Sequence, residues 1–261
     1  MKTWTIANQK GGVGKTTTAV SLAGVLADRG QKTLMIDLDP HGSMTSYFGL
    51  DPDSVEESVY SLFQAAANDE KISMASVLKR TRIPNLSLLP ASTSLVSLDR
   101  QFGSRGGMGV VIKNALNRWG NHFDHVIIDC PPMLGVLLVN ALAASDRVIV
   151  PVQTEFLALK GLERIQHTFN LMRHAHQLPF KELIVPTMFD SRTRASHDSL
   201  KFLQENYAES LWEMVIPVDT QFREASKAGL PLPLMKPRSR GSLAYQTLLD
   251  DLLEREEESI L

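Results

Sequence analysis

The stretch ANQKGGVGKTTTAV, residues 7–20, resembles a phosphate-binding loop. It follows a short apolar run at residues 4–7 and precedes a helical pattern at residues 16–28, so a glycine-rich turn joins an expected strand to an expected helix. Backbone N–H groups in such a turn close around phosphate oxygens, and the positive end of the helix attracts the same anion. The sequence therefore predicts a phosphate-binding loop formed by Gly11, Gly12, Val13 and Gly14.

The loop departs from the usual G-x-x-x-x-G-K-[ST] pattern. Lys15 is placed to neutralise the β- and γ-phosphates, Thr16 to bind Mg²⁺ and Thr17 to contact another phosphate. The opening glycine of the pattern is replaced by Gln9, and an additional lysine, Lys10, follows it. From the residues alone, Lys10 is equally well a solvated loop lysine or a second phosphate ligand.

Further apolar runs recur along the chain, at residues 33–37, 86–90, 125–129, 148–151, 183–186 and 214–216. Helical patterns separate them, notably at 155–175, 196–208 and 241–257. Continuous apolar strands alternating with helices indicate an α/β fold with a mostly parallel twisted sheet and helices on both faces, as in P-loop NTPases. We expect residues 1–261 to form one domain, with residues 51–82 as a polar, irregular surface excursion.

Three acids stand at the ends of two of these runs: Asp37, Asp39 and Asp129. A carboxylate at the tip of a buried strand is costly unless a cation meets it, and ligands of parallel sheets bind at the carboxyl ends of the strands. For Asp37 or Asp39 alone, a helix cap or a loop carboxylate is an equal alternative. Three acids beside a phosphate loop favour roles in binding Mg²⁺ and positioning water next to ATP.

Composition narrows the classes of protein. The formal net charge is -2, so any surface for nucleic acid has to be a local patch. The single cysteine, Cys130, excludes an internal disulfide and an iron–sulfur cluster shared between two subunits, which needs two cysteines per chain. Residues 1–10 lack the apolar core of a signal peptide, and no run reaches the length of a membrane span. We expect a cytoplasmic protein with no membrane partner.

Three motifs in combination, KGGVGKTT, DLDPHGS and VIIDCPP, resemble the ParA/MinD family of deviant Walker ATPases. The segments PVQTEFLALKGLERI, PTMFDSRTRAS and KPRSRGSLAY look like those of chromosomal, Soj-like ParA proteins, so the resemblance covers nearly the whole chain. It implies a slow, partner-stimulated ATP hydrolase that forms an ATP-dependent sandwich dimer. The dimer would position a cargo, which is a chromosome or plasmid partition complex or a polar chemotaxis cluster.

The resemblance also implies roles for individual residues. Lys10 matches the family's signature lysine, which reaches across the dimer to the partner's phosphates, and Gly11 would share that contact. Asp39 would position the attacking water. The remaining residues fall into three groups: the phosphate and metal ligands Lys15 and Thr16, the acids Asp37 and Asp129 near Mg²⁺, and the adenine neighbours Thr187, Met188 and Pro217.

The partners implied by the resemblance are a second copy of the chain, nonspecific DNA, and a ParB-like, polar-landmark or chemotaxis adaptor protein. Six basic side chains would contact DNA, although a solvated surface is an equal reading: Arg192, Arg223, Lys227, Lys236, Arg238 and Arg240. Soj-like chains usually read IPRNVRLSEAP where this chain reads IPVDTQFREAS, so Val218 and Gln221 replace both arginines. The run DPHGSMTSYFG looks most like the subgroup that localises chemotaxis clusters, which places the protein at the nucleoid or a cell pole.

Two other functions remain open. The first is a metabolic synthetase on the same scaffold, with a substrate pocket lined by Ser43, Arg105 or His122. The second is a MinD-like membrane-associated regulator, which would use an amphipathic C-terminal helix. Leucines at 248, 249, 252 and 253 form an apolar stripe there, but residues 250–258 hold six acids and one arginine. Such a tail is repelled by anionic lipid, so we expect this helix to dock on the core.

Overall fold

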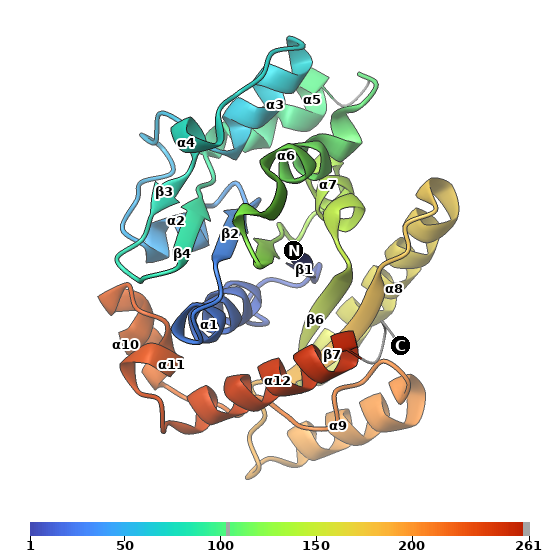
Figure 1. Cartoon of the computed structure of the whole chain (residues 1–261). Helices are drawn as coiled ribbons and strands as arrows, with labels where there is room; N and C mark the ends of the chain where they lie inside the picture. Colours follow the sequence, from blue (N-terminus) through green and yellow to red (C-terminus); the bar gives the residue numbers. More distant parts are fainter. Residues whose placement is uncertain (103–104, 258–261) are drawn as a thin grey trace.

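The computed structural model describes residues 1–102 and 105–257. Its strands form one seven-stranded sheet in the order β3-β4-β2-β5-β1-β6-β7 (Figure 1). Every neighbouring pair is parallel except β3 and β4, which confirms the predicted sheet. The strands are β1 Lys2–Ile6, β2 Thr33–Asp37, β3 Lys79–Arg80, β4 Leu86–Leu89, β5 His125–Asp129, β6 Arg147–Gln153 and β7 Lys181–Thr187.

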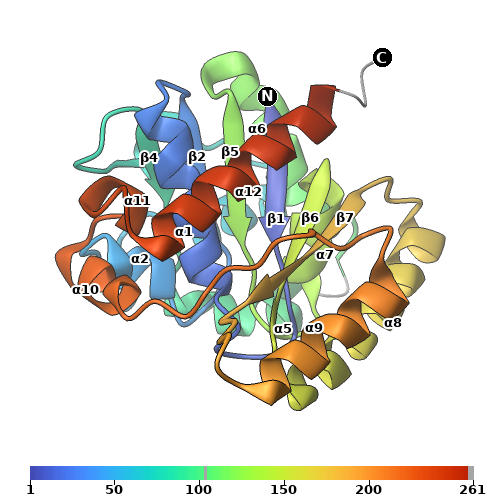
Figure 2. The same cartoon turned by 90° about the horizontal axis from the view of Figure 1, so that it is seen from below.

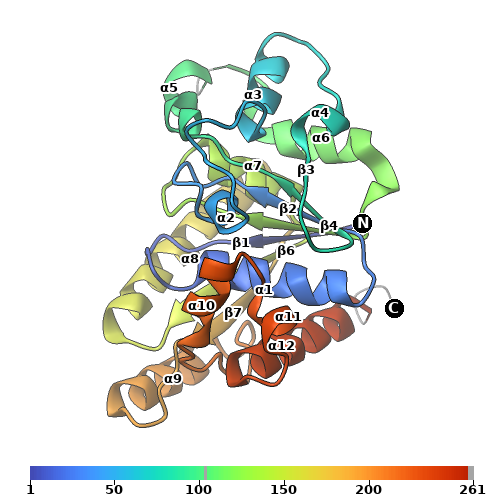
Figure 3. The same ribbon diagram turned by 90° about the vertical axis from the view of Figure 1, so that its left-hand side faces the viewer.

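Helices cover both faces of the sheet, with α1 and α12 on one side and α3, α6 and α7 on the other (Figure 3). The helical patterns predicted from the sequence appear as α1, α8, α9 and α12, within one or two residues at each end. The helices are α1 Lys15–Asp28, α2 Ser43–Tyr47, α3 Val59–Ala67, α4 Met74–Val77, α5 Leu98–Phe102, α6 Val111–Trp119, α7 Val136–Ala144, α8 Phe156–His176, α9 Arg194–Tyr207, α10 Gln221–Ala228, α11 Leu232–Met235 and α12 Arg240–Glu257.

The alternation of side chains along the central strands builds two apolar layers. In β2, Leu34 and Ile36 pack with α3 and α6, whereas Met35 packs with α1 and α12 on the opposite face. Successive strand residues point to opposite faces, so a strand covered on both sides must be apolar throughout. This explains why the strand runs read as continuous apolar segments.

The strand register brings the predicted site residues to one edge. Asp37 at the end of β2 is the register partner of Asp129 at the end of β5, and Asp129 is also paired with Ile6 of β1. The phosphate loop leaves β1 at this same edge. The neighbours of β1 are β5 and β6, so the chain changes direction across the sheet here, and ligands of open α/β sheets bind at such a point.

Two expectations about secondary structure were wrong. Residues 214–216 are not a strand but an extended loop beside β7, in which Ile216 N–H donates to Pro186 O and Phe189 N–H donates to Ile216 O. Only an isolated bridge, between Phe189 and Pro217, forms there. Prolines at 186 and 217 have no N–H to donate, so a regular ladder cannot continue.

Residues 51–82 are more than a surface excursion. The helix α3 lies within them and buries Val59, Leu62 and Phe63 in the layer that α6 also covers. The apolar pattern of this helix spans only nine residues and is flanked by polar residues, so the sequence did not indicate a helix here.

The C-terminal helix α12 docks on the core, as predicted. Leu248, Leu249 and Leu252 are fully buried in the layer that contains α1, and the helix crosses that face obliquely (Figure 2). Of the six acids predicted there, Glu258 lies outside the described residues. No helix in the described part of the chain has both the length and the apolarity to cross a membrane.

Candidate nucleotide site at the carboxyl edge of the sheet

The glycines of the loop serve different purposes. Gly12 has φ 75° and Gly14 has φ 93°, the left-handed region that favours glycine. Gly11 does not have a positive φ, and a Cβ added to it would meet nothing within 4 Å. The fold of the chain therefore explains Gly12 and Gly14, but the described residues give no reason for glycine at position 11.

Positive charge gathers where the loop enters α1. Lys15 is the first residue of α1, is 8% exposed, and its Nζ donates to the carbonyl oxygen of Lys10 at 3.2 Å. No side chain in the described structure caps the start of α1, and its first turn holds no acid. The helix N-terminus and Lys15 together form a site that attracts an anion.

Asp129 is the group that most needs a cation. Thr16 Oγ1 donates to Asp129 Oδ2 at 2.6 Å, but the buried Oδ1 has no hydrogen-bond partner within the described residues. Burial, together with the nearby charge of Asp37, raises the pKa of Asp129. An unpartnered acceptor beside a hydroxyl suits a hydrated Mg²⁺, whose water ligands would donate to it.

Both carboxylate oxygens of Asp37 accept hydrogen bonds from neighbouring residues. Its Oδ2 accepts from Thr45 N–H at 2.8 Å and Thr45 Oγ1 at 2.7 Å, and its Oδ1 accepts from Asp39 N–H at 3.1 Å. Burial nevertheless raises the pKa of Asp37. This carboxylate fixes the turn that carries Asp39, so the geometry favours Asp129 over Asp37 as the acid that faces a metal.

Asp39 lies in a more open position. Its Oδ1 accepts from His41 N–H at 3.0 Å and lies 2.8 Å from His41 Nδ1, and its side chain remains 14% exposed. Asp39 is therefore accessible to water, which Asp37 is not.

A cavity of about 540 Å³ brings six of the predicted residues together: Gly14, Thr16, Thr17, Thr187, Met188 and Pro217. Thr187 Oγ1 also donates to Val13 O at 2.9 Å, which ties β7 to the phosphate loop. The sequence did not single out four residues of the wall, Tyr47, Gln153, Phe222 and Tyr245, and it marked a fifth, Arg223, only as a candidate for DNA contact. These residues come from four separate elements, α2, β6, α10 and α12, and no local motif marks them as cavity residues.

Lys10 lies away from the Thr16–Asp129 pair. Its N–H donates to Asn8 Oδ1 at 2.9 Å, and its Nζ forms an ion pair with the carboxylate of Glu155, just before α8. Its side chain is 26% exposed. The structure thus places the additional lysine at the rim of the site, bound to its own chain.

The residues suggested for a synthetase pocket do not come together. Ser43 lines the 540 Å³ cavity, but Arg105 does not. His122 lies before β5, at the opposite edge of the sheet, in a separate cavity with Lys32 and Arg82.

The expected DNA-binding patch carries mixed charge. Arg192 donates through Nε and Nη2 to Asp190 at 2.9 and 2.7 Å, and Lys236 pairs with Glu224 at 3.0 Å. Arg238 and Arg240 line a cavity of about 660 Å³ that also contains Asp190 and Asp219. Acids therefore neutralise part of this surface.

Comparison with known proteins identifies the family of the chain. A family model described as an AAA domain matches residues 1–181. The sporulation initiation inhibitor protein Soj of Bacillus subtilis (strain 168) is 36% identical over 95% of this chain and 96% of its own. The chromosome partitioning protein ParA of Myxococcus xanthus is 35% identical over 96% of this chain and 87% of its own.

Among solved structures, cobyrinic acid a,c-diamide synthase of Mycobacterium smegmatis with bound ADP and magnesium is 33% identical. It superimposes with a TM-score of 0.85 over 99% of this chain and 96% of that one. The match to Soj and ParA extends over almost their full lengths and not only over the phosphate loop. The chain therefore belongs to the Soj/ParA branch of the ParA/MinD family of P-loop ATPases.

Proposed function

We propose that this protein is a ParA-like ATPase that binds ATP and Mg²⁺ at the carboxyl edge of its sheet. The observation that carries the proposal is Asp129, a buried acid beside the Thr16 hydroxyl with one oxygen that no described residue contacts through a hydrogen bond. The M. smegmatis relative, by its description, binds ADP and magnesium. In this proposal the whole chain acts as one nucleotide-binding domain.

The residues divide the work between them. Lys15 and the backbone N–H groups of the loop bind the phosphates, and the Thr16 hydroxyl and Asp129 would hold Mg²⁺ through its water ligands. Bound Mg²⁺ would neutralise charge on the phosphates. Asp39, which is open to solvent, positions the attacking water. Thr187, Met188 and Pro217 border the adenine in the same cavity.

Lys10 and Gly11 support a sandwich dimer. A cation supplied by the partner stabilises charge on the transferring phosphoryl group, as an arginine finger does. A Cβ at position 11 would meet no atom within 4 Å in the described part of the subunit. Glycine at this position therefore leaves space for a neighbouring subunit to approach the backbone. We infer that Lys10 contacts the partner's phosphates and that Gly11 lies in the interface.

The Lys10→Ala variant tests this function. It should bind nucleotide as tightly as the wild type in a fluorescence titration, yet it should remain monomeric with ATP and Mg²⁺ in sedimentation velocity. Lys113→Ala, which removes an exposed lysine from α6, is the matched control and should dimerise normally. ATP-dependent dimers that persist in Lys10→Ala would contradict the proposal.

We further propose that the ATP dimer binds duplex DNA weakly and positions its cargo by a cycle that a ParB-like or polar adaptor protein stimulates. This places it in the cytoplasm, at the nucleoid or a pole. Arg223, Lys227 and Arg238 have no ion pair with an acid in the described chain and are the strongest candidates. Cosedimentation with DNA should require ATP and should weaken between about 50 mM and about 200 mM salt.

A synthetase is the second candidate, and the name of the M. smegmatis relative favours it. Incubation with ATP and candidate carboxylic acids, followed by product analysis, distinguishes the two. Inorganic phosphate as the sole phosphorylated product supports the ParA-like function, whereas a phosphorylated small molecule would overturn it. A MinD-like membrane role loses its basis because the leucine stripe of α12 is buried.

A further inference from the structure

The ion pair between Lys10 and Glu155 connects the phosphate loop to a segment 145 residues away. Gly161 in α8 lies beside Lys10, since a Cβ at position 161 would be in van der Waals contact with Lys10 Cβ, at 3.4 Å. The additional lysine of the loop therefore lies along the first turns of α8 in its own subunit.

Helix capping does not explain the orientation of Glu155. The residue occupies the N-cap position of α8, but its side chain accepts no hydrogen bond from the helix, and Lys10 is the partner that the described structure gives it. The positive end of α8 favours an ionised carboxylate there. Glu155 is thus a charged group turned away from capping and toward the loop.

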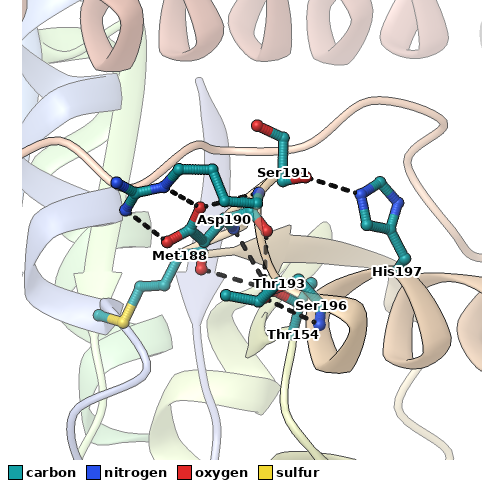
Figure 4. A network of polar contacts seen from close by, with 8 residues as sticks. Thr154, Met188, Asp190, Ser191, Thr193, Ser196 and His197 are labelled. Carbon is teal, nitrogen blue, oxygen red and sulfur yellow. Dashed lines mark hydrogen bonds and ion pairs between the residues drawn. The ribbon is translucent and has the colours of Figure 1, made fainter.

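The backbone that carries Glu155 is firmly anchored. Thr154 is 3% exposed, its N–H donates to Thr187 O at 3.1 Å, and its Oγ1 donates to Ser196 Oγ at 3.2 Å. Ser196 in turn accepts from Thr193 and from the Asp190 N–H (Figure 4). The backbone of Glu155 therefore lies at a fixed junction between β6 and α8, whereas the ammonium group of Lys10 is at the end of a flexible side chain.

The strength of the pair suits a reversible contact. The side chains of Lys10 and Glu155 are 26% and 41% exposed. Ion pairs of this kind change an equilibrium constant by a factor of about 1.5 to 5. Such an ion pair holds the lysine in place but breaks when nearby phosphates, which carry more negative charge, bind the lysine instead.

We propose that Glu155 is a latch that holds Lys10 within its own subunit when no nucleotide is bound, so that Lys10 must leave Glu155 before it reaches the partner's phosphates. This inference rests on the proposed sandwich dimer. Each dimer that forms breaks two such ion pairs. The two pairs together therefore raise the dimer dissociation constant by the square of the factor for one pair, about 2- to 25-fold.

The Glu155→Gln variant tests the latch, because the amide keeps the shape of the side chain and removes its charge. With ATP and Mg²⁺, its dimer dissociation constant in sedimentation velocity should fall by about fivefold. Lys10 of the nucleotide-free variant should also react faster with an amine-specific acylating reagent, followed by mass spectrometry. Glu163→Gln breaks the exposed pair with Lys160 on the same helix and should change neither quantity.

The outcomes separate this inference from the proposed function. A wild type that never dimerises with ATP refutes the proposed function, and the reactivity of Lys10 in the monomer still tests the contact. A wild type that dimerises, with a Glu155→Gln dissociation constant that is unchanged or raised, overturns the latch. Unchanged reactivity of Lys10 in Glu155→Gln would overturn it as well.

Discussion

Two buried acids at opposite ends of the sheet differ in how they are paired. Glu256 of α12 accepts from Trp4 Nε1 at 3.2 Å and pairs with Lys2 at 2.7 Å and Arg147 at 3.4 Å. Burial alone would raise the pKa of Glu256, but Lys2, Arg147 and Trp4 together bring it below its ordinary value. Asp129 has one hydroxyl partner and, among residues 1–102 and 105–257, no partner for its other oxygen, and its pKa is raised.

This difference in charge balance distinguishes a carboxylate that stabilises the fold from one that binds a ligand. A buried carboxylate with its charge balanced belongs to the packing of α12 on the core, whereas one left unbalanced costs stability until a ligand arrives. The sheet edge at Asp129 is therefore suited to binding a cation and an anion, whereas the charges at the Glu256 edge are already paired within the protein. Variants of the two acids should therefore have opposite effects on the nucleotide-free protein.

The largest effect is expected from Glu256→Gln. It leaves Arg147 buried without a charged partner, which should lower the free energy of unfolding by about 2 kcal/mol. Urea unfolding without nucleotide measures this. Glu254→Gln, an exposed acid on the same helix, is the control and should be neutral. Equal effects of the two variants would mean that Glu256 is not a structural acid.

Asp129→Asn should act in the opposite direction. Burial raises the pKa of Asp129 to about 8, so at neutral pH this carboxyl must take up a proton when the nucleotide-free protein folds. The amide avoids that cost, so the free energy of unfolding should rise by about 1 kcal/mol at neutral pH. The added stability that Mg²⁺ gives to the wild type in the presence of ATP should be lost. Thermal unfolding with and without Mg²⁺ checks both parts, and a destabilised nucleotide-free variant would show that Asp129 is already balanced.

The pH dependence of stability should distinguish the same two acids. A folded-state pKa raised above the unfolded value of about 3.9, as for Asp129 and Asp37, gives stability that is lost as the pH rises through the folded pKa. The lowered pKa of Glu256 gives stability that is lost as the pH falls through it. Urea unfolding across pH should show that Asp129→Asn flattens the pH dependence between about pH 4 and about pH 8, and that Glu256→Gln flattens it on the acid side.

The smallest effect is expected from Asp250→Asn on α12. Asp250 and its partner Arg29 are 52% and 37% exposed, so their ion pair should contribute less than about 0.5 kcal/mol to the free energy of unfolding. Urea unfolding in low and high salt measures it. A loss as large as that of Glu256→Gln would show that position on α12, and not burial, sets the cost.

The sequence indicated the sheet and the phosphate edge because these depend on short-range patterns. The loop at residues 10–17 and the acids Asp37, Asp39 and Asp129 all follow apolar runs, and parallel strands end at one edge. The aromatic wall of the cavity and the partner of Lys10 depend on packing between distant segments. Tyr47, Tyr245 and Glu155 sit in ordinary helical or loop contexts, so only the folded structure reveals them.

The most direct test of the account is a mixing experiment with two single variants, Lys10→Ala and Asp39→Ala, each of which should hydrolyse ATP poorly alone. If Lys10 acts on the partner's nucleotide, a mixed dimer has one complete site, formed by Asp39 of one subunit and Lys10 of the other. Mixing the two variants should therefore restore ATP hydrolysis, up to about one active site per mixed dimer. No recovery on mixing, with mixed dimers confirmed by sedimentation, would contradict it.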